Sequence, residues 1–290
     1  MKVCGFTIVR NALKYEYPVK EAILSVLPVC DEFLVAVGNS EDETLQLIQS
    51  INSPKIKIIE TIWDDSLREG GTILAVETNK AIDAISHDFD WLFYIQADEV
   101  LHEKYHDEVL EQMKKWKNDT KTEGLLFKYV HFYGSYHYVG DSRNWYRNEI
   151  RVIKNDKSIR SYKDAQGFRK NGQKLNVRAI DAEIYHYGWV KHPKYQQAKQ
   201  ENFNKLWHSD EWVEQNVVKA DEYDYKRLDI LKKFQENHPL VMQSRVESMN
   251  WKFEYNTQNF KSSLKLKFLN IIEKVFGWRV GEYKNYKLIK

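Results

Sequence analysis

The residues best suited to chemistry in this chain are two adjacent carboxylates, Asp98 and Glu99, at the end of an apolar run. The run is Trp91-Leu92-Phe93-Tyr94-Ile95, followed by Gln96-Ala97. A continuous apolar stretch of this length predicts a strand buried on both faces, which would place the carboxylates at the carboxyl edge of a parallel sheet. Open α/β folds bind ligands at this edge, where a carboxylate can hold a divalent cation against a phosphate. By itself the pattern also fits a strand that ends in a solvated turn.

Strand and helix patterns alternate along the first hundred residues, and these elements must position the carboxylates. Strands are expected at 3–9, 33–37, 56–59 and 91–95. Helices are expected after Pro18, after the capping-box pattern Ser40-Glu41-Asp42-Glu43 and after Gly71. This order predicts a parallel sheet with helices on both faces and right-handed crossovers.

The pattern changes in the second part of the chain. After a helix near 103–117, strands are expected at 125–133, 149–154 and 182–187. We expect these strands to share one sheet with the first four. From residue 193 onward helical patterns dominate.

The composition narrows the possible classes of protein. The 290 residues suit one large α/β domain with an appended subdomain, or two domains. The formal charge of +2 gives no general attraction to nucleic acid, so no nucleic-acid partner is expected. Cys4 and Cys30 lie in apolar surroundings, which predicts buried thiols in a reducing compartment. No stretch reaches the ~18 apolar residues of a membrane span, and the first residues fit a strand better than a signal peptide, so a cytoplasmic protein is expected.

Aromatic residues are abundant, at 14% of the chain. Such an abundance is compatible with sugar stacking and with an aromatic-rich core. One cluster between 129 and 146 contains Tyr129, Phe132, Tyr133, Tyr136, Tyr138, Trp145 and Tyr146. It could form a platform for an acceptor sugar or pack against the sheet, and a mixture of the two is expected.

Five short motifs follow one another in the chain. They are Ile8-Val9-Arg10-Asn11, Gly38-Asn39-Ser40-Glu41-Asp42-Glu43-Thr44, the segment from Gly71 to Glu77-Thr78-Asn79, Gln96-Ala97-Asp98-Glu99, and Tyr185-His186-Tyr187-Gly188-Trp189. In this order the chain resembles the family 2 glycosyltransferases, inverting enzymes of the GT-A fold, over roughly residues 3–190. The second motif looks like that family's Asp-Gly-Ser-x-Asp-x-Thr turn, and the fourth like its Asp-x-Asp-Glu metal motif.

The resemblance implies an α/β fold of the GT-A type, a Rossmann-like mixed sheet flanked by helices, over residues 1–192. Residues 1–100 would form the nucleotide-sugar half, 101–192 the acceptor half, and 193–290 a helical C-terminal extension. Donor-binding positions are implied at Val9, Arg10, Asn11, Gly38, Asn39, Asp42, Gly71, Thr78, Gln96, Ala97 and Asp98.

The resemblance also implies a metal site, with Asp98 and His186 as ligands and Mn²⁺ or Mg²⁺ as the ion. Such an ion would neutralise the charge that develops on a leaving diphosphate. Three positions depart from the family pattern. Gly38 replaces the first Asp of the turn, Gln96 replaces the first Asp of the metal motif, and Thr78 stands where Arg is usual.

An incoming hydroxyl group needs a general base on the face opposite the leaving group. Asp164 is the first candidate, because it follows the 149–153 strand, where similar enzymes present an acidic residue. Glu99, Asp141 and Glu149 are the alternatives.

These expectations together predict a metal-assisted, inverting glycosyltransferase. It would move a sugar from a UDP- or GDP-sugar to a hydroxyl of a glycan or a lipid-linked acceptor. A sugar nucleotidyltransferase is one alternative, although Arg10-Asn11-Ala12-Leu13 lacks the glycines of a phosphate loop. A nucleotide- or carbohydrate-binding protein without catalysis is another, which Gln96 and Gly38 favour.

The last thirty residues form a basic tail. Residues 261–290 carry eight Lys or Arg against two Glu, and Leu264, Phe268, Ile271, Ile272, Val275 and Phe276 fall on one helical face. This pattern fits peripheral contact with the inner face of a membrane, or a terminal helix docked on the body.

Overall fold

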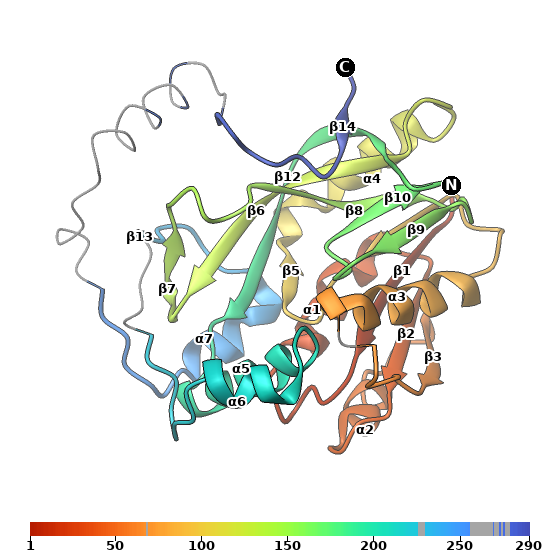
Figure 1. The fold of residues 1–290 in the computed structure, drawn as a ribbon. Helices are drawn as coiled ribbons and strands as arrows, with labels where there is room; N and C mark the ends of the chain where they lie inside the picture. Colours follow the sequence, from red (N-terminus) through yellow and green to blue (C-terminus); the bar gives the residue numbers. More distant parts are fainter. Residues whose placement is uncertain (68, 226–229, 256–268, 270–272, 274, 276–278) are drawn as a thin grey trace.

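The computed structural model describes residues 1–67, 69–225, 230–255, 269, 273, 275 and 279–290. Within them the main sheet has 11 strands. These are β1 (Val3–Val9), β2 (Glu32–Gly38), β3 (Ile56–Thr61), β4 (Trp91–Tyr94), β5 (Glu99–Leu101), β6 (Gly124–Tyr133), β7 (Ser135–Gly140), β8 (Asn148–Lys154), β12 (Asn176–Trp189), β13 (Leu231–Lys233) and β14 (Lys287–Leu288). Figure 1 shows them as one twisted layer, with the spatial order β13-β7-β6-β8-β4-β1-β2-β3 along its main path.

The first four strands form the predicted parallel half of the sheet. β1 pairs in parallel with β2 on one side and with β4 on the other, and β2 pairs in parallel with β3. The connecting helices are α1 (Val19–Val26), α2 (Thr44–Gln49) and α3 (Thr72–Ala84). The chain moves outward from β1 to β3 and then returns to the other side of β1 as β4. The strand order therefore reverses between β1 and β4, where α/β sheets leave a crevice at their carboxyl ends.

Burial of both faces explains why the parallel strands appear in the sequence as continuous apolar runs. In β1, Val3 and Val9 pack with α1 and with α4 (His106–Trp116). Cys4, Phe6 and Ile8 pack with α3 on the opposite face. Because successive side chains point to opposite faces and helices cover both, every residue of the strand is buried.

The second half of the sheet is mixed. β8 runs antiparallel to both β4 and β6, and β6 pairs in parallel with the 14-residue strand β12. A separate three-stranded sheet contains β9 (Ile159–Tyr162), β10 (Gly167–Lys170) and β11 (Gln173–Lys174). The expectation of one shared sheet is confirmed, and so is the α/β class, a Rossmann-like mixed sheet flanked by helices.

Short elements complete the described chain. The 3₁₀ helices are η1 (Leu27–Val29), η2 (Glu69–Gly71), η3 (Glu103–Tyr105) and η4 (Leu240–Met242). The C-terminal part has α5 (Pro193–Lys205), α6 (Asp210–Asn216) and α7 (Gln243–Glu247). It also adds the two short strands β13 and β14 to the main sheet, which the expectation of a helical extension over 193–290 did not include.

Two local expectations are wrong. Ser40 does not cap α2, since its hydroxyl accepts a hydrogen bond from the Asn11 amide and donates to the Gly38 carbonyl. The Thr44 amide at the start of α2 instead donates to Asp42, at 3.1 Å. Glu99 does not lie in a solvated turn after the apolar run, because it begins β5, which pairs antiparallel with β12. A three-residue strand carries too little periodicity to be detected from sequence.

The cysteines are buried, as the sequence predicted. Cys4 and Cys30 are buried free thiols, and burial raises the pKa of Cys4 to about 12. No helix in the described part of the chain has the length and apolar character needed to cross a bilayer. The predicted apolar face of the tail lies largely outside the described residues.

Candidate active site

A cavity of about 560 Å³ opens at the crevice between β1 and β4. Its lining includes eight residues singled out from the sequence, namely Val9, Arg10, Asn11, Gln96, Ala97, Asp98, Asp164 and His186. They come from the ends of β1 and β4, from the β9–β10 turn and from β12. Segments far apart in the sequence therefore meet where the topology places a ligand site.

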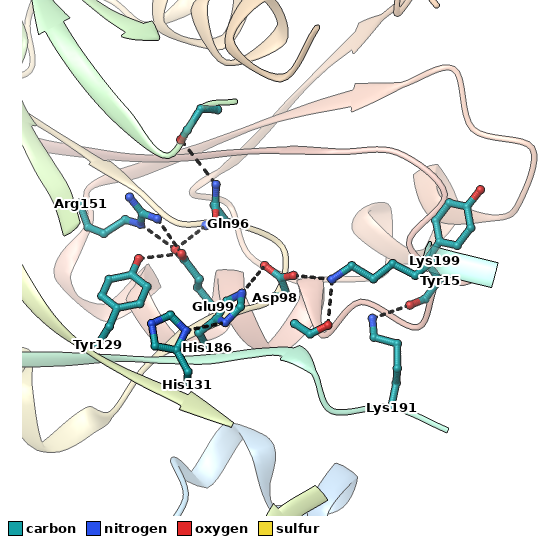
Figure 2. A network of polar contacts seen from close by, with 12 residues as sticks. Tyr15, Gln96, Asp98, Glu99, Tyr129, His131, Arg151, His186, Lys191 and Lys199 are labelled. Carbon is teal, nitrogen blue, oxygen red and sulfur yellow. Dashed lines mark hydrogen bonds and ion pairs between the residues drawn. The ribbon is translucent and has the colours of Figure 1, made fainter. Parts of the chain in front are cut away.

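Asp98 lies between Lys199 and His186 (Figure 2). Its Oδ2 is 3.1 Å from the Lys199 Nζ, and its Oδ1 is 3.8 Å from the His186 Nε2. Burial acts to raise the pKa of Asp98, but the Lys199 ammonium opposes it, and the pKa lies well below its usual range. Asp98 is therefore an ionised carboxylate that already faces a cation supplied by the protein.

A hydrogen bond with His131 fixes the orientation of the His186 ring. The His131 Nε2 lies 2.8 Å from the Tyr146 carbonyl oxygen, which can only accept, so this nitrogen carries a proton. Burial lowers the pKa of His131 to about 3, so the ring is neutral and its Nδ1 is an acceptor. The His186 Nδ1, 3.1 Å away, must then donate to it. Burial also lowers the pKa of His186, and the His186 Nε2 lies 3.8 Å from the Asp98 Oδ1.

Glu99 is held in the protein interior beneath this site. Both its side chain and that of Arg151 are 0% exposed, and the guanidinium makes two hydrogen bonds of 2.7 Å to the carboxylate. The Tyr129 hydroxyl donates to the same carboxylate at 2.6 Å, and the backbone N–H of Gln96 donates to it at 3.0 Å. Glu99 is not among the residues that line the cavity. The structure thus gives Glu99 a positioning contact and no access to a substrate, contrary to the expected catalytic role.

Asp98 and His186, the predicted metal ligands, do converge, but the donor set around them is small. Gln96 brings no charge, and its Nε2 lies 3.5 Å from the Tyr94 hydroxyl and the Ala165 carbonyl. Among the described residues, no group of three His, Cys, Asp or Glu side chains could hold a metal ion.

The Lys199 ammonium adds an electrostatic cost to metal binding. Two like unit charges 4 Å apart repel by about 4 kcal/mol at an effective dielectric constant of 20, and a divalent ion doubles this. A divalent ion bound to Asp98 would face that repulsion from Lys199, which lies 3.1 Å from the same carboxylate. The residues present therefore fit an ammonium group and do not fit a Mn²⁺ or Mg²⁺ ion.

Asp164 reaches the cavity from the turn between β9 and β10. Its neighbours Lys163 and Ala165 have φ values of 54° and 59°, in the left-handed region. A non-glycine residue there costs about 1–2 kcal/mol, and such strain gathers at functional sites. Burial raises the pKa of Asp164 above its usual value. A raised pKa and a fixed turn suit a carboxylate that accepts a proton.

Other predicted donor-binding residues stabilise the loops around the cavity. The Asn11 Oδ1 accepts a hydrogen bond of 2.7 Å from the Glu41 amide, and the Asn39 Oδ1 accepts one of 3.0 Å from the Trp63 amide. Arg10 forms an ion pair of 2.5 Å with Asp65, a residue that also lines the cavity.

Five predicted donor-binding positions lie outside the cavity lining, namely Gly38, Asn39, Asp42, Gly71 and Thr78. Asp42 accepts hydrogen bonds from the Lys14 and Thr44 amides. The Thr78 hydroxyl donates to the Leu74 carbonyl within α3. The structure thus gives Asp42 and Thr78 local structural contacts. Gly71 borders the cavity through its neighbours Asp164 and Trp207, and Gly38 through Trp63.

Changing Gly38 to alanine should displace Trp63. A Cβ at position 38 would lie 2.3 Å from the Trp63 Nε1. We expect a loss of about 1–3 kcal/mol in the free energy of unfolding, as for other overpacked sites, and a shift in tryptophan emission. Urea unfolding and fluorescence measure both effects. A second change, Trp63→Leu, should restore most of the stability. Equal stability of Gly38→Ala and wild type would contradict the close packing.

Sequence reasoning missed the contribution of α5 and of several rings. The helix and the residues after it supply Lys199, Gln200, Asn202, Phe203, Lys205, Leu206 and Trp207 to the cavity lining. Lys199, Phe203 and Leu206 follow helical spacing, which was the available signal. Of the aromatic cluster at 129–146, Tyr146 lines the cavity, whereas Tyr129, Phe132, Tyr133, Tyr136 and Tyr138 are buried.

No protein-family model and no curated protein sequence matches this chain. Solved structures that align with it include TarS from S. aureus, at 13% identity and a TM-score of 0.42, over 76% of this chain and 41% of TarS. A second is 4-diphosphocytidyl-2C-methyl-D-erythritol synthase from Anaerococcus prevotii DSM 20548, at 10% identity and a TM-score of 0.40, over 66% of this chain and 91% of that one.

A third is glucosyl-3-phosphoglycerate synthase from Mycobacterium tuberculosis, in complex with Mn²⁺, UDP and phosphoglyceric acid. It aligns at 17% identity and a TM-score of 0.30, over 45% of this chain and 43% of that one. Because these TM-scores lie below 0.5, the three likenesses assign no activity to this chain.

Proposed function

We propose that this chain is an inverting glycosyltransferase of the GT-A type, related to family 2. It takes the sugar of a nucleoside diphosphate sugar, with UDP or GDP as the nucleotide, and transfers it to a hydroxyl of a glycan or lipid-linked acceptor. The observation that carries the proposal is the cavity at the β1–β4 crevice, where Asp164, Asp98 and Lys199 meet. The five motifs that resemble the family support it independently.

The residues around the cavity suit the two ends of a nucleotide sugar. Arg10, Lys199 and Lys205 supply positive charge for a diphosphate. The rings of Trp63 and Trp207 offer faces on which a base or a sugar can stack. A pocket that combines aromatic walls with a few charged groups is typical of small-molecule sites.

The proposed reaction is a single displacement. The acceptor oxygen forms a bond to the anomeric carbon while the bond from that carbon to the diphosphate oxygen breaks. The electron pair of the broken bond stays on the diphosphate, and the proton of the acceptor hydroxyl passes to Asp164. Asp98 would position the cationic group of the site, His186 would border it, and Glu99 with Arg151 would hold the backbone of the 96–99 segment.

Filling the cavity should weaken nucleotide binding. We expect wild-type protein to bind either UDP or GDP at one site, and Ala97→Phe, which places a ring in the cavity, to weaken binding at least about tenfold. Titration calorimetry with UDP, GDP and CMP measures this. Ala84→Phe, the same change at an exposed position of α3, is the matched control.

Three outcomes separate the possible functions. Binding that Ala97→Phe removes, together with release of diphosphate from the matching nucleotide sugar, supports the transferase. Binding without turnover in the presence of acceptors would favour a nucleotide-binding protein without catalysis. No binding of the three nucleotides, or binding that Ala97→Phe leaves unchanged, would exclude the proposed site.

A further inference from the structure

Lys199 places an ammonium group directly against Asp98, although the two residues are 101 positions apart in the chain. It comes from α5 and lines the cavity, and its side chain is 11% exposed. Its Nζ is 3.1 Å from the Asp98 Oδ2 and 2.9 Å from the Gly188 carbonyl oxygen. The centre of the Tyr17 ring is 5.1 Å from the nitrogen. Figure 2 shows the Lys199 side chain extended toward Asp98.

The start of α5 is fixed by its neighbours. Lys191, which is 1% exposed, donates a hydrogen bond of 2.8 Å from its Nζ to the Tyr15 carbonyl. The Tyr225 hydroxyl donates to the Lys191 carbonyl at 2.9 Å. Pro193 occupies the first turn of the helix, where its missing N–H costs nothing. Lys191, at the junction between β12 and α5, is thus held through both its side chain and its backbone. These contacts fix the start of α5 and with it the direction of Lys199.

Gly188 allows Asp98, His186 and Lys199 to meet. A Cβ at this position would lie 2.7 Å from the Asp98 Oδ2 and 2.6 Å from the His186 Nε2. Any side chain would therefore push the carboxylate away from the ammonium.

The ammonium also has a donor to spare. A lysine ammonium has three N–H donors, and within the described chain Asp98 and Gly188 are the acceptors found for Lys199. One donor is left to point into the cavity that Lys199 lines.

We infer that Lys199, and not a divalent metal ion, is the cation that faces the diphosphate of the donor. This inference rests on the proposed function. The third N–H of Lys199 donates to a diphosphate oxygen, and its positive charge balances the negative charge that grows on that oxygen as the bond to the anomeric carbon breaks. Lys199 keeps its proton throughout, while the acceptor proton goes to Asp164. Asp98 positions the ammonium.

The test is nucleotide affinity with and without metal. Wild type, Lys199→Met, Lys199→Arg and Lys194→Met are titrated with UDP, GDP, uridine and guanosine, each in EDTA and in Mn²⁺. Lys194→Met is the matched control, because Lys194 is exposed on the same helix. We expect wild type to bind its diphosphate equally well in both conditions. Lys199→Met should bind it about 10- to 100-fold more weakly, the loss expected when a charged hydrogen bond is removed.

Two further measurements show whether the loss of affinity concerns the diphosphate. The nucleoside without phosphates should bind Lys199→Met as it binds wild type, and Lys199→Arg should recover most of the diphosphate affinity because it retains the charge. The thermal midpoint of each variant, measured in parallel, shows that the protein is folded.

Failure of the inference and failure of the proposed function give different results. Diphosphate binding that is lost in EDTA and is unchanged in Lys199→Met would overturn the inference and leave the proposed function standing. Binding of no nucleotide by wild type in either condition would overturn the proposed function, and the inference with it.

Discussion

Replacing Arg151 with methionine should lower the free energy of unfolding by about 3–5 kcal/mol. The guanidinium and the Glu99 carboxylate are both 0% exposed, so the variant leaves a buried carboxylate without its counter-charge. Arg151 also donates to the Gln166 carbonyl at 3.2 Å, which joins the 96–99 segment to the turn that carries Asp164. Loss of Arg151 should therefore reduce both stability and activity. Urea unfolding followed by circular dichroism measures the first effect, and diphosphate release the second.

Two controls isolate the effect of burial. Arg160→Met removes an ion pair with Asp83 whose side chains are 35% and 58% exposed, and it should cost about 1 kcal/mol or less. The double variant Arg151→Met, Glu99→Gln removes both charges and should recover much of the lost stability, because no unpaired carboxylate remains. If Arg151→Met and Arg160→Met lowered stability equally, burial would not be what makes the Arg151–Glu99 pair important.

Changing Asp164 to asparagine should lower kcat by about 10²- to 10⁴-fold, the usual contribution of a general base. The substitution keeps the size and polarity of the side chain but removes its ability to accept a proton. Affinity for UDP or GDP should change little, because Asp164 acts on the acceptor hydroxyl. Steady-state kinetics and calorimetry on the same preparations separate the two quantities.

The pH dependence gives a second readout for Asp164. Because burial raises the pKa of Asp164, its ionised, active form is lost as pH falls through that raised value. Wild-type kcat/KM should therefore fall on the acid side at a pH above the value of about 4 that is usual for aspartate. Asp164→Asn should lack this fall.

Two carboxylates serve as comparisons for Asp164. Asp141→Asn changes an exposed residue paired with Lys232 at 3.6 Å, and it should leave kcat unchanged. Glu149 lies outside the cavity lining, and burial raises its pKa to about 8, so it is largely protonated at neutral pH. If Glu149→Gln reduced kcat as much as Asp164→Asn does, the assignment of the base to Asp164 would be wrong.

Local patterns in the sequence were sufficient to predict the parallel half of the fold and the edge that carries the site. Apolar runs and helical spacing are local signals, and they placed β1, β2, β3 and β4 in the right order. The pairing of β4 with β1, which makes their carboxyl ends neighbours, is a property of the tertiary structure. This pairing brings Arg10 and Asp98 to one cavity. Asp164 and His186 were candidates only through the resemblance to a known family.

Which of these groups face one another depends on tertiary packing. Asp98 and Glu99 are adjacent in sequence and equally charged, yet one faces the cavity and the other is buried against Arg151. Their difference arises because β5 pairs antiparallel with β12, a register that brings Glu99 opposite His186. Asp98 lies in the turn before β5 and Glu99 is the first residue of that strand, so strand pairing and not residue type separates their roles.

The same reason explains why Lys199 could not be assigned to the site from sequence. Its contact with Asp98 spans 101 positions, and the Arg151–Glu99 contact spans 52. Local periodicity reports which face of an element is buried, but it carries no information about which distant element covers that face. The closure of α5 over the crevice places an ammonium where the family pattern implied a metal ion. The charge of the site therefore results from packing between distant segments, while the edge of the sheet that carries it was already predicted from the strands.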